Sequence, residues 1–594
     1  MNSILGRSAP SVDDTLDSHL GNNLSKTEIT DSFIDSFVHE VEILKHDCNL
    51  QLLTINRPIN VVNSFFLPKA SSTKIQLIIN SLSSNKSSGY DEIRATEIKI
   101  LAAKETNLLF ITDLINKCIS EGSVPEMLKV SVCRPIYKSG SYLDFKNYRP
   151  IAIQSVLDLV LEKYLSEKLL DYVEKYHLID PCQYAYQREK GTEDLLDDFT
   201  SFIYNKLSNG QFVLCLFLDF TKAFDTIIHE KLFVILESIG VRGLPLKLIK
   251  NYLSGRKMTV RFKDNFSKLS EIKQGVPQGS ILGPLLFLIY ANQLLKLSTF
   301  CKTFMYADDM VLLCPNIYLE DAKSQLQQDF NNILKWSHDY GLIINSNKSK
   351  VMCISSPHNK IEVNKSIKSH TFDCLHNLRD PTFSVTDDCD CPLLDIVSNF
   401  KYLGVMVDCT FNWNLQLDLL KQRLKNIMIM LYHLNLHAPR QVVKRAYTAL
   451  AESTIRYGIL AWGNASKTKL EIIKNIQERM LKIVSGIDSR SDFKVDPFFD
   501  LQVLDVFDIH KYTVLTKNCF SNKFKSAVSL DQQTRSTKQM QYIVPFSGST
   551  FKDKTKEVLV PKIFNQIPLD LHLINSKSKF KRETKRWLIN NHLK

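Results

Sequence analysis

The sequence has no apolar run long enough to cross a membrane and no apolar segment near its start of the kind that directs secretion. Its longest apolar run, residues 281–290, contains Gly283 and Pro284 and reaches only about half the roughly 20 residues that a spanning helix needs. Three aspartates stand between positions 13 and 17, where a secretory signal would be apolar. We therefore expect a chain that is neither membrane-bound nor secreted and that resides in the nucleus and cytoplasm.

Several motifs of known enzyme and binding-protein classes are also absent. No Gly-rich loop ending in Gly-Lys-Ser or Gly-Lys-Thr appears, so a nucleotide hydrolase or kinase of that type is not supported. There is no internal repeat and no array of Cys-x-x-Cys knuckles. The 13 cysteines are scattered, and some, such as Cys215 and Cys314, lie in apolar segments. An odd number of cysteines without a secretory signal predicts reduced thiols.

Charge is abundant and unevenly distributed. The 594 residues carry a formal net charge of +12, and 44% of them are hydrophobic, which predicts more than one domain and a sizeable core. Residues 1–60 are acidic, whereas residues 571–594 carry seven Lys or Arg against the single acid Glu583. The excess of positive charge suits a polyanionic partner. The basic tail fits either a nucleic-acid contact or a solvated helix face.

The most informative local feature is the tetrapeptide YADD at residues 306–309, between the apolar runs 303–305 and 310–313. This pattern predicts a β-hairpin with Asp308 and Asp309 at its tip. Two adjacent carboxylates repel each other unless a cation neutralises them, and Mg²⁺ prefers such oxygen ligands. An isolated Asp-Asp pair is more often a solvated loop, so the interpretation needs further residues.

A third carboxylate follows the continuous apolar run at residues 212–218. That run is typical of a buried strand, and Asp219 stands directly at its end. A carboxylate there can lie beside the tip of a neighbouring hairpin. Three such carboxylates are what nucleotidyl transfer by two metal ions requires.

The surrounding motifs resemble the reverse transcriptases of non-LTR retrotransposons, in particular the jockey-like elements of arthropods. The resemblance covers roughly residues 60–594. Its motifs, in chain order, are KSSGYD at 86–91, GSVP at 122–125, RPIYK at 134–138, NYRPI at 147–151, QYAYQ at 183–187, DFTKAFD at 219–225, YLSGR at 252–256, GVPQGSILGPLLF at 275–287, YADD at 306–309, GLIIN at 341–345, YLGV at 402–405, YG at 457–458 and WG at 462–463.

The resemblance implies an α+β fold of the right-hand polymerase type, with fingers, an antiparallel palm sheet and a helical thumb. We expect a polar, partly helical leader over residues 1–60 and a helical extension of the fingers over 61–130. Fingers and palm would occupy 131–410, with a polar insert at 356–397. The thumb would follow at 411–490, and a basic helical region at 491–594.

The resemblance also assigns roles to the carboxylates and their neighbours. Asp219 and Asp308 would be direct Mg²⁺ ligands, Asp309 would complete the negative pocket, and the backbone carbonyl of Phe220 would add a ligand. Two Mg²⁺ ions, with Mn²⁺ as a possible substitute, would serve transfer of a dNTP to a primer 3′-hydroxyl on an RNA template. Phe224 would lie beneath the incoming sugar and exclude a 2′-hydroxyl; the alternative is ordinary core packing.

Four further residues are expected to contact the nucleotide. Lys138 and Arg149 would reach the triphosphate from the fingers, since Lys is a point charge and Arg binds phosphate bidentately. Gln278 and Gly279 would approach the nucleotide or template, because glycine allows close contact with backbone. Ser280 would cap the helix that follows.

Lys348 would protonate the leaving pyrophosphate by analogy with the same family, a general-acid role. The alternative for Lys348, and for Lys138, is an ordinary solvated cation.

The insert at 356–397 contains His370, Cys374, His376, Cys389 and Cys391. These residue types bind zinc, but both the cysteine and the histidine pairs are closer than in standard zinc fingers. The spacing therefore favours a surface loop over a metal site.

A complete element of this family would also carry an N-terminal endonuclease, and the roughly 60 residues before the resemblance are too few for one. We therefore expect target-primed copying of RNA into target DNA with a nick made elsewhere, for instance by a separate endonuclease. A decayed element copy that only binds RNA is the alternative from another functional class. A maturase-like or telomerase-like polymerase is the alternative within the polymerases.

Overall fold

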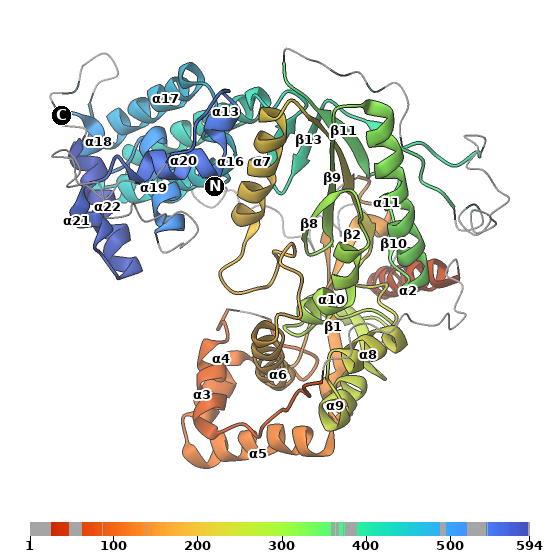
Figure 1. Ribbon diagram of the computed structural model, residues 1–594. Helices are drawn as coiled ribbons and strands as arrows, with labels where there is room; N and C mark the ends of the chain where they lie inside the picture. Colours follow the sequence, from red (N-terminus) through yellow and green to blue (C-terminus); the bar gives the residue numbers. More distant parts are fainter. Residues whose placement is uncertain are drawn as a thin grey trace.

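The computed structural model describes residues 25–46, 62–85, 87–138, 140–357, 361, 363, 367–371, 374, 389–487, 493, 495–519, 542 and 544–591. Helices and mixed β-sheets alternate along the chain, and two of the sheets have five strands each. Figure 1 shows the sheets in the middle of the molecule, with helices α3–α6 below them and the C-terminal helices gathered to one side.

The central sheet has the strand order β12-β11-β3-β9-β8. Strands β11, β3, β9 and β8 are antiparallel to their neighbours, whereas β12 joins β11 in parallel. Its strands are β3 (Phe212–Leu218), β8 (Lys302–Tyr306), β9 (Asp309–Asn316), β11 (Lys350–Ile354) and β12 (Asp395–Ile396). The buried strand and the β-hairpin predicted from the sequence are therefore both present.

Strand β3 is apolar throughout because both of its faces are covered. All seven of its residues are buried. Leu214 and Leu216 belong to one hydrophobic cluster, and Val213 and Cys215 belong to a second cluster on the opposite face. Side chains alternate between the two faces of a strand, so a strand in the middle of a molecule needs an apolar residue at every position.

The second five-stranded sheet runs β2-β1-β5-β6, with β7 also paired to β5. Strand β1 is antiparallel to β2 and parallel to β5. The strands are β1 (Val130–Tyr137), β2 (Tyr148–Ile153), β5 (Lys257–Phe262), β6 (Asn265–Phe266) and β7 (Ser270–Glu271). This sheet brings the segments around positions 138 and 149 beside each other.

Helix α2 (Lys26–His46) packs against this second sheet. Phe33 is fully buried there, and its ring meets Tyr148 edge-on at 5.0 Å between centroids. Glu40 at the other end of α2 pairs with Lys222. The helix predicted from apolar spacing in this region is confirmed. The rest of the 1–60 leader, residues 1–24 and 47–60, lies outside the described residues.

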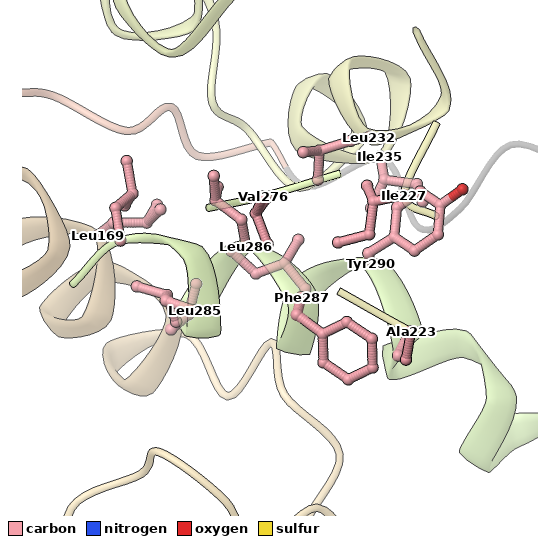
Figure 2. Close-up of a cluster of buried hydrophobic side chains, with 14 of the residues drawn as sticks. Leu169, Ala223, Ile227, Leu232, Ile235, Val276, Leu285, Leu286, Phe287 and Tyr290 are labelled. Carbon is pink, nitrogen blue, oxygen red and sulfur yellow. The ribbon is translucent and has the colours of Figure 1, made fainter. Parts of the chain in front are cut away.

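Helices surround one end of the central sheet and fill the space between the two sheets. Figure 2 shows Tyr290 of α10 beside Ile227, whereas Leu285 of the same helix lies on the side of Leu169. All of these side chains belong to one buried hydrophobic cluster. The helices of this part are α3 (Ser72–Ser81), α4 (Ala95–Ala102), α5 (Glu105–Glu121), α6 (Val156–Lys175), α8 (His229–Ser238), α9 (Gly243–Leu253), α10 (Gly283–Ala291) and α11 (Leu319–Asp339).

The described part of the chain is almost entirely helical after residue 413, as expected for the helical thumb and C-terminal region. The short strands β13 (Asn399–Tyr402) and β14 (Val405–Asp408) lead into it. Helix α7 (Thr192–Ser208) connects this part to the central sheet (Figure 1). The helices are α13 (Asn414–Asn435), α14 (Arg440–Tyr447), α15 (Ser453–Arg456), α16 (Ile459–Trp462), α17 (Lys467–Ser485), α18 (Pro497–Asp500), α19 (Val506–Asn518), α20 (Lys556–Phe564), α21 (Leu569–His572) and α22 (Lys577–Asn591). Among the helices described, none is long and apolar enough to cross a bilayer.

Candidate active site

The hairpin of β8 and β9 turns within two residues. Tyr306 and Asp309 are its last paired residues, so Ala307 and Asp308 form the turn. Ala307 has a left-handed backbone with φ of +55°, as tight hairpin turns require. The amide of Ala307 donates to the side-chain oxygen of the fully buried Gln183 at 3.2 Å. This contact holds the turn, and with it Asp308, in a defined position.

Asp219 lies at the same end of the sheet as the hairpin tip. Leu218, the last residue of β3, pairs with Met310, so Asp219 follows one member of that pair and Asp309 precedes the other. The amide of Asp219 donates to the hydroxyl of Ser349 at 3.2 Å, and its carbonyl accepts from the amide of Asn345 at 2.8 Å. The structure thus brings all three predicted carboxylates together.

The two hairpin carboxyls, Asp308 and Asp309, bind protons more tightly than isolated aspartates do. Burial raises the pKa of Asp308, and the charge of Asp219 raises it further. The pKa of Asp309 rises to about 6, first because its surroundings exclude water and then because Asp308 and Asp219 are close. Burial and neighbouring like charges both raise the pKa of a carboxyl group, and burial is the larger cause for Asp308 and Asp309. Cations near this end of the sheet would relieve that repulsion.

Three predicted cations face the carboxylates. The ammonium nitrogen of Lys348 lies 3.7 Å from a carboxylate oxygen of Asp219. Partial burial lowers the pKa of Lys138, and the nearby charges of Lys348 and Arg149 lower it further, against the opposing effect of Asp219 and Asp308. Strand pairing places Arg149 on β2 opposite Ile136, two residues before Lys138. The site therefore combines the acidic end of the central sheet with basic side chains from the second sheet and with Lys348 from the loop before β11.

Gln278 is anchored by two contacts. Its side-chain nitrogen donates to a carboxylate oxygen of Asp225 at 2.6 Å, and its carbonyl accepts from the amide of Ala152 at 2.7 Å. Burial raises the pKa of Asp225 to about 6, and the hydrogen bond from Gln278 opposes that rise. Gln278 is therefore held between β2 and the segment that follows Asp219.

The glycine at 279 is required by close packing of two backbones. Gly279 has φ of +120°, and a Cβ built there would lie 2.4 Å from the carbonyl oxygen of Ala152. The hydroxyl of Ser280 accepts from the amide of Gly283 at 2.8 Å. The N-cap of α10 is Leu282, which makes no side-chain cap hydrogen bond, so Ser280 is not the N-cap predicted from the sequence; its hydroxyl instead contacts the first amide of the helix.

The two predicted phenylalanines differ in exposure. Phe220 is 5% exposed, and its residue pairs with Ile344 where β4 (Phe220–Thr221) meets β10 (Ile343–Ile344). Phe224 is half-buried and stacks on Phe287, with 4.4 Å between ring centroids and 24° between planes. The stacking fixes the Phe224 ring near Asp225, on the edge of the site.

Sequence reasoning missed three residues at this site. Asp225 holds Gln278, Gln183 holds the hairpin turn, and Tyr186 lies near Asp308, whose charge adds to burial in raising the pKa of Tyr186. All three belong to motifs of the sequence. Asp225 is a second acid six residues after Asp219, and that signal alone could have identified it.

The raised pKa of Asp309 predicts a pH-dependent stability. A carboxyl that binds its proton more tightly in the folded chain makes folding less favourable as pH rises from near 3.8 to about 6. In a chelator, the melting temperature of the wild type should therefore fall relative to that of Asp309→Asn between pH 4 and 7. Mg²⁺ should restore it at pH 7. Equal pH profiles for the two proteins would contradict this electrostatic account, and Asp321→Asn, at an exposed acid on α11, is the matched control.

The central part of the chain matches a known protein family. Residues 136–407 match the family described as reverse transcriptase (RNA-dependent DNA polymerase). That range contains both five-stranded sheets, except for the residues of β1 that precede position 136. It also contains all ten of the site residues predicted from the sequence.

Individual relatives come from insect mobile elements. The RNA-directed DNA polymerase from mobile element jockey of Drosophila funebris is 25% identical over 430 residues, which cover 70% of this chain and 43% of the relative. The probable RNA-directed DNA polymerase from transposon X-element of Drosophila melanogaster is 24% identical over 68% of this chain and 43% of the relative. A polyprotein from the R2 element of Popillia japonica is 26% identical over 48% of this chain and 38% of its own length. The chain thus spans less than half the length of these relatives.

Proposed function

We propose that this chain, whose residues 136–407 form a reverse transcriptase domain, is the RNA-directed DNA polymerase of a non-LTR retrotransposon of the jockey-like type. Reverse transcriptases generally use divalent metal ions, an RNA template, a nucleic-acid primer and dNTPs. The observation that carries the proposal is the convergence of Asp219, Asp308 and Asp309 at one end of the central sheet, faced by basic side chains.

The donor set at this end of the sheet fits Mg²⁺. It consists of carboxylate oxygens, which are the ligands that hard divalent cations prefer. Asp219, Asp308 and Asp309 would hold two Mg²⁺ ions, or Mn²⁺ as a substitute, with the carbonyl of Phe220 as a further ligand. Bound there, the ions would supply charge stabilisation for the attacking and leaving oxygens.

The remaining residues would position the reactants. Lys138 and Arg149 would bind the triphosphate of the incoming dNTP from the second sheet. Gln278 and Gly279 would support the nucleotide or the template base, and Lys348 would donate a proton to the departing pyrophosphate. Since phosphoryl transfer requires little covalent chemistry from the protein, alignment and charge neutralisation would account for most of the rate.

The architecture suits a right-hand polymerase. In this proposal the central sheet is the palm, the second sheet belongs to the fingers, and helices from α13 onwards include the thumb. The RNA would be bound through its phosphates and 2′-hydroxyls.

Target-primed copying in the nucleus would also need a nick in the target DNA. A separate endonuclease activity would supply this nick. The chain itself would be made in the cytoplasm.

The half-buried ring of Phe224 predicts sugar selectivity. Phe287 braces this ring from one side, so it would meet a 2′-hydroxyl of the incoming nucleotide with little room to move. Phe224→Val should lower the preference for dTTP over UTP by about 10–100-fold, measured as the ratio of kcat/KM values in primer extension. Phe233→Val, at a partly buried ring on α8 that faces His229 and Lys250, is the matched control. An unchanged preference in Phe224→Val would show that its ring only packs.

Primer extension tests the proposed function directly. The substrate is poly(rA) annealed to oligo(dT), with dTTP and Mg²⁺, and binding of the same duplex is measured in parallel. Extension supports an RNA-templated polymerase. Binding of the duplex without extension by a folded chain would favour the alternative, an element-derived protein that only binds RNA.

A further inference from the structure

The polar insert between β11 and β12 contains a cluster of four side chains that the reverse transcriptase chemistry does not use. His370, Cys374, Cys389 and Cys391 each present one ligand atom, and these four atoms all lie within 4.8 Å of one another. Residues 372–373 and 375–388, and therefore His376, lie outside the described part of the insert. From the geometry of the four described side chains we propose that they form a structural zinc site of the Cys₃His type.

Two distances from the histidine nitrogen to cysteine sulfurs fit a tetrahedral zinc ion. The Nδ1 atom of His370 lies 3.4 Å from the sulfur of Cys374 and 3.5 Å from the sulfur of Cys389. Zinc binds imidazole nitrogen at about 2.0–2.1 Å and thiolate sulfur at about 2.3 Å, so adjacent ligand atoms of a tetrahedron are roughly 3.6 Å apart. The nitrogen and both sulfurs are already at that separation.

The backbone that carries these side chains is fixed by contacts of its own. The amide of Ser369 donates to the carbonyl of Pro392 at 2.8 Å, and the amide of Leu394 donates to the carbonyl of Ile367 at 2.9 Å. Ile367 and Leu394 are each only 2% exposed and belong to the main hydrophobic cluster. Two segments of the insert, joined by an isolated antiparallel bridge between Lys368 and Leu393, thus meet beside the core and carry His370 and Cys391.

A second set of hydrogen bonds fastens this part of the insert to α11. The amide of Lys368 donates to the side-chain oxygen of Gln327 at 2.8 Å, and the side-chain nitrogen of Gln327 donates to the carbonyl of Lys368 at 2.9 Å. One hydrogen bond uses the amide of Lys368 and the other uses its carbonyl. A shift of the segment just before His370 would therefore break both hydrogen bonds to Gln327.

The sulfur atoms receive the hydrogen bonds that zinc thiolates favour. The amide of Thr371 donates to the sulfur of Cys391 at 3.5 Å, and the ammonium of Lys368 lies 3.6 Å from the sulfur of Cys389. Three thiolates and one neutral imidazole around Zn²⁺ carry a net charge of −1, which an adjacent lysine balances. Such outer contacts orient ligands and tune their basicity.

Zinc explains this cluster better than a disulfide or a harder cation. A disulfide would join two of the three sulfurs at about 2.05 Å and would leave the third cysteine and the histidine without a role. Hard ions such as Mg²⁺ prefer oxygen, whereas thiolates with imidazole select zinc. The site would join the two ends of the insert. Cys391 is four residues from β12, which pairs with β11, and β11 pairs with β3, the strand that precedes Asp219.

The test uses the full chain, with any affinity tag removed, purified without chelators. Elemental analysis should find one zinc per chain, and Co²⁺ exchanged into the protein should give the near-ultraviolet thiolate charge-transfer absorption. Cys391→Ser should lower the affinity for Zn²⁺ at least about 10-fold. Cys409→Ser, at a partly buried cysteine outside the cluster, should retain one zinc.

A second measurement covers the case in which Cys391→Ser does not fold. In the wild type, Cys374, Cys389 and Cys391 should resist alkylation until a strong chelator is added, and peptide mapping by mass spectrometry reads each cysteine separately. Alkylation of all three without chelator, a disulfide among them, or an unchanged Zn²⁺ affinity in Cys391→Ser would each overturn the proposal. Because both readouts are independent of polymerase activity, the proposed reverse transcription can fail while the zinc site stands.

Discussion

Asp308→Asn should reduce primer extension on an RNA template by at least about 1000-fold while leaving the chain folded and able to bind the duplex. The substitution preserves the shape of the side chain and removes one of the three charges that would hold the metal ions. Asp308 stands in a two-residue turn that Gln183 holds in place. A neighbouring carboxylate therefore cannot move into the position that Asp308 leaves. The measurement is kcat at saturating dTTP and Mg²⁺, with duplex affinity measured separately.

Asp321→Asn is the matched control for this prediction. It makes the same chemical change at an exposed acid in the first turn of α11, so kcat should stay within about 2-fold of the wild type, as expected for a surface change away from the site. If Asp308→Asn kept more than one tenth of wild-type extension, the hairpin acids would not be the metal ligands. The proposed mechanism would then fail even if the chain proved to be a polymerase.

Arg256→Met should lower the free energy of unfolding by about 3–5 kcal/mol, the usual cost of leaving a buried charge without its partner. The guanidinium of Arg256 lies 3.2 Å from a carboxylate oxygen of Asp158, with side-chain exposures of 4% and 0%. Burial raises the pKa of Asp158, while Arg256 opposes that rise. The loss of Arg256 would be measured as a lower melting temperature.

The same buried network reaches the loop before α10. Glu162, one turn after Asp158 on α6, accepts the hydroxyl of Tyr252 and the amide of Ile281, both at 2.5 Å. Ile281 follows the Gln278–Ser280 segment that borders the site. Arg256→Met should therefore also reduce dTTP affinity below the temperature at which the protein melts, through displacement of this loop.

Arg188→Met is the control for the buried pair. Arg188 also pairs with two acids, Asp171 and Glu174, but its side chain is 56% exposed, and exposed ion pairs contribute about 1 kcal/mol or less. Similar melting temperatures for the two variants would show that Arg256 is dispensable for the fold. They would also show that the YLSGR motif at 252–256 needs another explanation.

Features of the fold that depend on a short stretch of the chain could be predicted from the sequence. The buried strand, its terminal Asp219, the hairpin and the helical C-terminal part follow from patterns within about 20 residues, and the structure confirms each of them. The family resemblance placed Lys138, Arg149, Phe224 and Gln278 near one another although they are scattered over more than 100 positions.

Other features depend on pairs that no local pattern connects. Gln183 meets Ala307 across 124 positions, and Arg256 meets Asp158 across 98. The motifs containing Gln183 and Arg256 were recognised, yet a motif does not say whether a residue touches substrate or supports the fold. Only the packing separates these roles: Gln183 holds a turn, and Arg256 neutralises buried acids.

The insert shows the same limit for metal ligands. Cys389 and Cys391 are too close in sequence for a standard zinc finger, so spacing favoured a loop. In the structure, His370 and Cys374 from the N-terminal side of the insert lie close to Cys389 and Cys391 from its C-terminal side. The sequence by itself determined which chemistry the strand ends carry, because alternation and turn formation act over a few residues. Tertiary structure decided which distant side chains meet, because those contacts depend on how separate elements pack around a shared core.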